Sequence, residues 1–122
     1  MIKVILDTNF LVYCAKQKID YAEEISKLMK SGFELTTISL VVDELEKLAK
    51  EEKKLSDRDA AKMASKILKT GVVKIIPVSG DNVDKEIIAL SGGNIIATLD
   101  RELKSKVERS IIIREGKKLE FG

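Results

Sequence analysis

Four acidic residues of this chain could share one site: Asp7, Glu44, Asp84 and Asp100. Asp7 directly follows the apolar run Ile2–Leu6, and Asp100 directly follows the run Ile95–Leu99. Carboxylates that are brought together repel one another unless a cation lies between them. The chain has no histidine and one cysteine, so the cation we expect is a hard divalent ion with oxygen ligands, Mg²⁺ or Mn²⁺. The four carboxyl groups should then lie within a few ångströms of a common point.

The two aspartates that follow apolar runs have two interpretations. An aspartate between a strand and a helix commonly caps the helix, and this interpretation suffices for Asp7 or Asp100 alone. In an open parallel sheet, however, ligands bind at the carboxyl ends of the strands. Thr8, Asn9 and Thr98 supply hydroxyl and amide groups there, which can orient a carboxylate, a bound water or a phosphate. The joint placement of all these groups at one sheet edge favours a functional site.

Helical periodicity places the other two acids. At about 100° per residue, Glu44 lies at the edge of an apolar helix face that comprises Val41, Val42, Leu45, Leu48 and Ala49. Asp84 projects between Ile87 and Ile88, so we expect it to face the sheet, where an unpaired carboxylate is costly. The alternatives are an exposed glutamate and, for Asp84, a carboxylate satisfied by the helix N-terminus. Asp81 is a rival to Asp84, but its position before the helix suits an N-cap.

The composition indicates a globular protein without a strong charge bias. There are 22 basic and 20 acidic residues, a net charge of +2, which is not by itself a nucleic-acid signature. With 2 tyrosines, 3 phenylalanines and no tryptophan, base stacking on aromatic side chains is not expected to dominate binding. No apolar run is long enough to span a bilayer, so we expect a cytoplasmic protein without a membrane partner. We expect the lone cysteine, Cys14, to be a small core residue.

Apolar strand-like runs alternate with helical patterns, which predicts one α/β domain over residues 1–122. The first strand should be buried on both faces, so we predict a three-layer α/β/α sandwich around a mainly parallel five-stranded sheet. The expected strands are Ile2–Leu6, Glu34–Ile38, Val72–Val78, Asn94–Leu99 and Ser110–Ile113, then a turn at Glu115-Gly116 and a short terminal strand with Leu119 and Phe121.

The expected helices have recognisable start and stop signals. Ser39 should cap a helix, Ser56 and Asp59 should form a capping box, and Gly32 and Gly71 should end helices. The expected helices are Phe10–Ala15, Tyr21–Lys30, Ser39 to about Lys53, Ser56 to Gly71, Val83–Ser91 and Asp100–Arg109.

Four stretches, taken in order, resemble the PIN domain, the small metal-dependent ribonuclease fold. They are Val4–Asn9, Val41–Leu45, Asp84–Ile88 and Ile96–Leu103, and the resemblance covers nearly the whole chain. The ending Ile113–Leu119 resembles archaeal PIN proteins related to the small-subunit processome nucleases. Two positions depart from the pattern. Leu99 stands where many PIN proteins have asparagine, and Lys85 follows Asp84 where those relatives often have paired acids.

The resemblance implies hydrolysis of RNA phosphodiester bonds with the help of one or two metal ions, leaving 5′-phosphate and 3′-hydroxyl ends. It assigns the catalytic and metal-binding roles to the four acids named above and supporting roles to Thr8, Asn9 and Thr98. It also implies the strand order 3-2-1-4-5, in agreement with the central place that the strand–helix alternation and its apolar character predict for Ile2–Leu6. The physiological role that it suggests is ribosomal RNA processing or RNA quality control.

Three cations beside the expected site are candidates for RNA contacts. Arg101 and Lys104 lie on the helix opened by Asp100, and Lys85 lies on the preceding helix. We expect them to bind phosphates of single-stranded or structured RNA without reading its bases; the alternative is a solvated charged face. The protein partners left open are a second copy of the chain, an antitoxin and a ribosome-assembly protein.

Several other functions compete with this hypothesis. A toxin of the VapC type is also a PIN nuclease, and a small antitoxin gene directly upstream would favour it. A non-catalytic RNA- or protein-binding PIN module is disfavoured by the full set of acids. A phosphoacceptor receiver domain needs two adjacent acids after its first strand and a lysine after its last core strand. In this chain Thr8 follows Asp7, and Arg114 stands where that lysine would be. The chain has no glycine-rich loop after Ile2–Leu6, which excludes a dinucleotide-binding fold. The absence of histidine excludes imidazole acid–base catalysis.

Overall fold

Strand β1 (Ile2–Leu6) lies inside a six-stranded sheet in the computed structural model, which describes residues 1–122. It pairs in parallel with β2 (Phe33–Ile38) on one side and with β4 (Ile95–Ala97) on the other. Val4, Ile5 and Leu6 are fully buried, because a strand of a parallel sheet is covered on both faces. The prediction that Ile2–Leu6 is the central strand is confirmed.

The strand order is β3-β2-β1-β4-β5-β6, with β3 (Lys74–Ile76) at one edge and β5 (Ser110–Arg114) followed by β6 (Lys118–Phe121) at the other. The first five strands are all parallel and follow the predicted order. The sheet has six strands where five were predicted, because the terminal strand β6 joins it antiparallel to β5. Glu115 and Gly116 both have positive φ, the backbone conformation that a tight hairpin turn requires.

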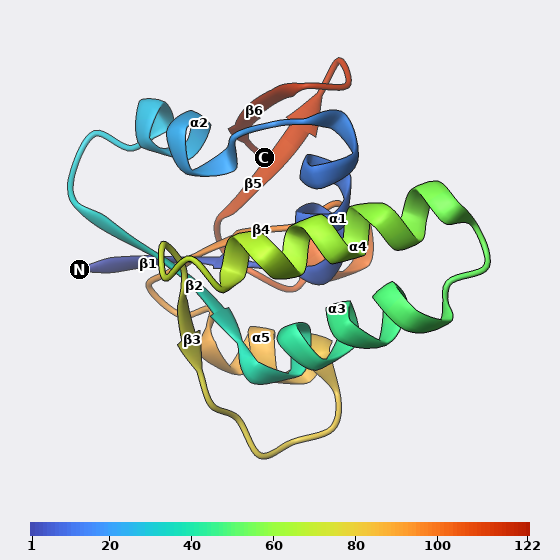
Figure 1. Cartoon of the computed structure of the whole chain (residues 1–122). Coiled ribbons are helices and arrows are strands. Elements are labelled where there is room, and N and C mark those ends of the chain that lie inside the picture. The colour runs from blue at the N-terminus through green and yellow to red at the C-terminus, as the bar shows by residue number, and fades with distance from the viewer.

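Six helices connect the strands: α1 (Thr8–Gln17), α2 (Tyr21–Leu28), α3 (Ser39–Glu51), α4 (Leu55–Leu68), α5 (Val83–Leu90) and α6 (Arg101–Ser105). The chain first proceeds from β1 to β3 and then crosses back to β4. Right-handed crossovers therefore place α1–α4 on one face and α5 and α6 on the other, which produces the predicted three layers. Figure 1 shows α4 crossing in front of β1, with α3 beside it.

Several element ends differ from the sequence-based prediction. Helix α4 begins at Leu55, before Ser56, and no side chain caps it, so the predicted capping box of Ser56 and Asp59 is wrong. Helix α6 ends at Ser105 rather than at Arg109. Strands β3 and β4 have only three residues each. Local sequence signals do not contain the tertiary contacts that start and stop these elements.

Three other predicted caps are also corrected. The N-cap of α3 is Ile38, and the Ser39 hydroxyl instead accepts a hydrogen bond of 3.0 Å from the Val78 N–H. The N-cap of α5 is Asn82, not Asp81. Helix α2 ends at Leu28, well before Gly32. The Ser39 contact fastens the start of α3 to the segment after β3, so α3 begins at the carboxyl end of the sheet.

The interior is one hydrophobic cluster of 22 buried residues, drawn from both faces of the sheet. Cys14 belongs to it as a free thiol, as predicted, and burial raises the pKa of this thiol to about 12. No helix combines the length and the apolar character that crossing a bilayer requires.

Candidate functional site

Asp7 lies buried at the carboxyl end of β1, with 5% of its surface exposed. Its Oδ1 accepts a hydrogen bond of 2.8 Å from the Thr8 N–H, so Asp7 caps α1 as the simpler interpretation requires. Its Oδ2 accepts a hydrogen bond of 2.7 Å from the Thr98 hydroxyl at the end of β4. The carboxylate is therefore held in one orientation by the start of α1 and by the residue that follows β4.

Thr98 connects three of the residues predicted to cooperate. Its hydroxyl donates to Asp7, lies 3.4 Å from Asn9 Oδ1, and accepts a hydrogen bond of 3.0 Å from the Asp100 N–H. Asn9 Oδ1 also accepts a hydrogen bond of 3.1 Å from the Leu99 N–H. The ends of β1 and β4 thus form one hydrogen-bonded unit around a buried hydroxyl.

The pKa of Asp7 is raised above its ordinary value of 3.8. Burial is the main cause, because it removes water from the charged form. The hydrogen bonds from Thr98 and Thr8 oppose this rise, while the negative charges of Asp84 and Glu44 add to it. These two acids are therefore close enough to act on Asp7 electrostatically, although they come from helices far apart in sequence.

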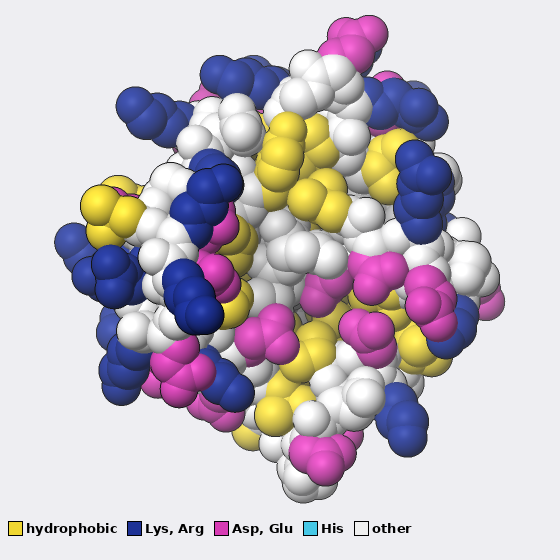
Figure 2. Space-filling model, turned by 90° about the vertical axis from the view of Figure 1, so that its right-hand side faces the viewer, with side chains coloured by type: hydrophobic (Ala, Val, Ile, Leu, Met, Phe, Trp, Pro, Cys, Tyr) yellow, Lys and Arg dark blue, Asp and Glu magenta, His cyan; other side chains and the backbone are white.

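The remaining acids surround Asp7 at the surface. Glu44 on α3 and Asp84 on α5 are exposed, and Asp100 at the start of α6 is half-buried. Figure 2 looks at the side towards which β1 runs in Figure 1, and it shows acidic side chains gathered near the middle of this face, with basic side chains mostly towards its margins. The acidic character is thus concentrated at the carboxyl edge of the sheet.

Two details of the predicted site need correction. Asp84 does not face the sheet: it is exposed, because α5 buries only Ile87. No group of three or more acidic or thiol side chains lies closely enough to hold a single metal ion directly. The expectation that all four carboxyl groups lie within a few ångströms of a common point is wrong in that strict form. Asp84 remains preferred over Asp81, since Asp84 is the one that affects the pKa of Asp7.

The arrangement nevertheless fits a hydrated divalent cation. The five ion pairs of the chain leave all four of these acids without a basic partner. The buried Thr8 hydroxyl beside Asp7 has no hydrogen-bond partner either. Mg²⁺ typically keeps several waters and is bound through one or two carboxylates and substrate phosphates, rather than by a closed cage of protein ligands. An oxygen-only group of acids that is spread around one buried carboxylate has the chemistry of such a site.

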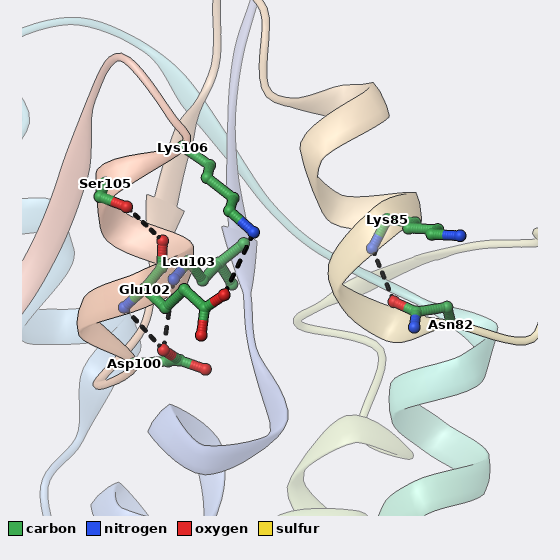
Figure 3. Close-up of polar contacts among 7 residues, drawn as sticks. All are labelled: Asn82, Lys85, Asp100, Glu102, Leu103, Ser105 and Lys106. Carbon is green, nitrogen blue, oxygen red and sulfur yellow. Dashed lines mark hydrogen bonds and ion pairs between the residues drawn. The ribbon is translucent and has the colours of Figure 1, made fainter.

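Asp100 has a second role at the start of α6. Its Oδ1 accepts hydrogen bonds of 2.9 Å from the Glu102 N–H and 3.2 Å from the Leu103 N–H (Figure 3). One carboxylate oxygen is therefore occupied by the cap, and no bond engages the other. The Glu102 side chain forms an ion pair with Lys106, at 3.3 Å, which neutralises this neighbouring acid.

Two of the three predicted RNA-binding cations lie together. Arg101 and Lys104 line a hollow of about 660 Å³ next to Asp100 and Thr98, which we call the Lys104 hollow. Neither cation is in an ion pair. Lys85 does not line it, and Figure 3 shows its ammonium group pointing away from α6.

Arg114 was not assigned to the site from the sequence, although it lines the Lys104 hollow from the end of β5 and forms an ion pair with Glu120. Its position at the carboxyl end of a core strand was the available signal.

The chain is similar to proteins of known type. A family model described as "PIN like domain" matches residues 4–114. The chain is 30% identical to Ribonuclease VapC4 of Methanocaldococcus jannaschii over 128 aligned positions, which span 99% of this chain and 97% of that protein. The structure of the PIN domain endonuclease Utp24 superposes with a TM-score of 0.73 at 25% identity, covering 97% of this chain and 90% of that one. The DNA-bound VapBC2 complex of Rickettsia felis shares the fold, with a TM-score of 0.63 at 18% identity over 93% of this chain and 99% of that one.

Proposed function

This chain belongs to the PIN-like domain family, and on that premise we propose that it is an endoribonuclease that depends on Mg²⁺ or Mn²⁺. The observation that carries the proposal is the buried Asp7 carboxylate, held by the Thr8 N–H and the Thr98 hydroxyl and surrounded by acids without basic partners. Burying a charge in this way costs free energy unless a cation compensates for it. We therefore expect the Asp7 carboxylate to bind a cation when the protein functions.

The four acids have distinct proposed tasks. Asp7 would bind the ion directly, while Glu44, Asp84 and Asp100 would hold its waters or complete its coordination. A bound divalent ion polarises the scissile phosphate and lowers the pKa of water, so that hydrolysis leaves 5′-phosphate and 3′-hydroxyl ends. The Thr98 hydroxyl keeps Asp7 in one orientation and donates to its ionised form. Because the pKa of Asp7 is raised, ion binding competes with a proton at this carboxylate.

RNA would be held next to these acids mainly by charge. Arg101 and Lys104 are unpaired and line the Lys104 hollow beside Asp100, so they are available to phosphates. Lys85 points away from α6 in Figure 3, and its proposed contribution is a weaker, long-range attraction.

The decisive experiment is cleavage of labelled single-stranded RNA by the purified protein in Mn²⁺, in Mg²⁺ and in EDTA. We expect cleavage in the presence of either ion, none in EDTA, and products that a 5′-phosphate-dependent exonuclease degrades. Asp7→Asn is the control against a contaminating nuclease. Cleavage that persists in EDTA or in the Asp7→Asn protein would reject the proposal.

We propose ribosomal RNA processing or RNA quality control as the physiological role, in the cytoplasm. The support is the resemblance of Ile113–Leu119 to proteins related to the small-subunit processome nucleases, together with the similarity to the endonuclease Utp24. Sequencing of RNA ends in cells with and without active protein tests this role. New ends should map to ribosomal RNA precursors.

A toxin of a toxin–antitoxin pair is the second candidate, and one surface favours it besides the relative named Ribonuclease VapC4. A groove of about 840 Å³ between α1, α2 and α4 is lined mostly by apolar residues, including Ile19, Met63 and Ile67. Met63 is 49% exposed, and Tyr21 in its wall has a buried hydroxyl without a partner. An amphipathic antitoxin helix could occupy such a groove.

The toxin hypothesis has its own test. Expression of the wild-type protein should arrest growth, Asp7→Asn should not, and a small protein encoded directly upstream should co-purify with the chain and suppress cleavage. The absence of growth arrest and of such a partner would leave the processing role.

A further inference from the structure

Two hollows meet at Leu99, and their linings differ in charge. The Lys104 hollow contains the unpaired cations Arg101 and Lys104. The second hollow, of about 350 Å³, lies between α1 and α3 and is lined by Val12, Tyr13 and Leu48 together with Glu44; we call it the Tyr13 hollow. Leu99, a large apolar side chain that is 37% exposed, lines both. The boundary between the two hollows thus lies directly before Asp100.

The Tyr13 hollow has no free positive charge. Its single cation, Lys16, forms an ion pair of 2.5 Å with Asp57, which lines the same hollow. Glu44 has no basic partner. Apart from the divalent ion that Glu44 would help to hold, the Tyr13 hollow therefore offers a phosphate no positive charge, whereas the Lys104 hollow does. The neutral, flat part of a nucleotide suits the Tyr13 hollow better.

The ring of Tyr13 is fixed before any ligand arrives. Its hydroxyl donates a hydrogen bond of 2.7 Å to the carbonyl oxygen of Gly116 in the turn between β5 and β6. This contact joins α1 to a hairpin more than a hundred residues later in the chain. Because the hydroxyl is already engaged, the ring itself is what Tyr13 offers to the hollow, at little cost in side-chain entropy.

The amide of Asn9 is also oriented in advance. Its Oδ1 accepts a hydrogen bond from the Leu99 N–H, which leaves the NH₂ group as the free end of the side chain. Asn9 is exposed, lines the Tyr13 hollow, and no protein group accepts a hydrogen bond from its NH₂. A fixed donor beside apolar walls is the combination that orients a ring carrying acceptor atoms.

We propose that the Tyr13 hollow is a nucleobase subsite, which holds the base of the nucleotide next to the scissile phosphate. The inference rests on the proposed endoribonuclease function and gives it a selectivity that phosphate contacts alone cannot supply. The volume lies near the lower end of the range of about 300–1,000 Å³ for small-molecule pockets, so it suits one nucleoside rather than a duplex. Tyr13, Val12 and Leu48 contact the base, and Asn9 donates to one of its acceptors.

Binding can be tested without cleavage. The full chain, labelled at its Val and Leu methyl groups, is titrated in Ca²⁺ with each of the four nucleoside 5′-monophosphates and with ribose 5-phosphate, which lacks a base. We expect at least one nucleotide to shift the signals of Val12 and Leu48 and ribose 5-phosphate to leave them unchanged. Equal shifts from all five compounds, or none, would overturn the subsite.

Selectivity is tested by sequencing the fragments that the Mn²⁺-loaded protein makes from a random RNA pool. We expect a base preference at one position adjoining the cut. Tyr13→Ala should reduce this preference by about fivefold to a hundredfold, the range of base–aromatic contacts. Tyr13→Phe, which keeps the ring and loses only the hydroxyl, should retain most of it. Equal losses in both variants would indicate a purely structural Tyr13 and overturn the proposal.

Further variants separate the subsite from the fold and from the proposed activity. Leu48→Ala, a second variant in the hollow, should also relax the preference, whereas Leu55→Ala, at an apolar residue that is 61% exposed and outside the hollow, should not. A protein that cuts no RNA but shows base-dependent shifts would reject the proposed function and support the subsite. A protein that cuts the RNA pool without base preference and shows no base-dependent shifts would support the proposed function and overturn the subsite.

Discussion

The Thr98 hydroxyl donates a hydrogen bond of 2.7 Å to Oδ2 of Asp7, 91 residues away along the chain. Both residues are buried, at 1% and 5% exposure. The contact partly offsets the rise that burial causes in the pKa of Asp7. Thr98 therefore acts on the proposed ion site through Asp7, as a positioning residue.

Replacement of Thr98 by valine should remove this contact while keeping the side-chain shape. Because a hydrogen bond to a charged group is lost and its partner stays buried, we expect a loss of about 2 kcal/mol in the free energy of unfolding at neutral pH. Cleavage should fall by about tenfold to a hundredfold, as for other groups that orient a metal-binding carboxylate. Urea denaturation and initial rates in Mn²⁺ measure the two effects.

Thr98→Ser is the matched control, since it retains the hydroxyl. It should keep most of the activity and the position of Asp7. A Thr98→Val protein as active as the wild type would show that the Thr98 contact does not position the carboxylate.

Replacement of Asp7 by asparagine should abolish cleavage while stability in EDTA stays equal or rises. Asparagine still offers an oxygen to the Thr8 N–H and so keeps the cap of α1, and it removes a buried negative charge. We expect activity to fall by more than about a hundredfold, because the loss of a metal-binding carboxylate should exceed the loss of a residue that only orients one. Asp7→Ala, which loses the cap as well, should be less stable than Asp7→Asn by about 1 kcal/mol. Thermal denaturation of both variants in EDTA separates charge from capping.

Stability without metal should depend on pH through Asp7. A carboxyl group whose pKa is raised in the folded state stabilises the fold fully below its unfolded pKa, and that contribution is lost as the pH rises through the folded value. Wild-type protein in EDTA should therefore lose stability, relative to Asp7→Asn, as the pH rises from about 4 upward. Denaturant midpoints of the two proteins across this range provide the test, and parallel curves would contradict the raised pKa. Saturating Mn²⁺ at neutral pH should remove or reverse the stability advantage of Asp7→Asn over the wild type, because the ion binds the folded wild type.

The double variant Arg101→Ala with Lys104→Ala should weaken RNA binding regardless of sequence. Each phosphate contact on a single strand contributes about −0.7 to the slope of log affinity against log salt, so the slope should become shallower by about 0.7 to 1.4. Fluorescence anisotropy with Ca²⁺ in place of Mg²⁺ measures binding without cleavage. Lys62→Ala with Lys66→Ala removes two exposed cations of α4 and is the matched control for net charge. Equal slopes for the two double variants would place the RNA path elsewhere.

The layer structure could be predicted from the sequence because it depends on patterns that are local. The apolar run Ile2–Leu6 and the alternation of strand and helix patterns predict a central β1 in a layered parallel sheet. The order that sets the carboxyl ends of β1 and β4 side by side comes from the resemblance to the PIN domain, and the structure confirms it. Asp7 and Asp100 then meet the same edge of the sheet, as predicted.

The orientation of the individual groups depends on the tertiary structure alone. Helical periodicity provides a projection but no distance, so it placed Asp84 against the sheet, whereas the shallow packing of α5 leaves it exposed. The Thr98–Asp7, Asn9–Leu99 and Tyr13–Gly116 hydrogen bonds join residues about 90 to 100 positions apart. Such pairs leave no trace in a local pattern, because each side chain is oriented by a neighbour that only folding brings to it. The chain itself determines which acids reach the edge of the sheet, and the folded packing determines that a cationic hollow and an apolar hollow adjoin them.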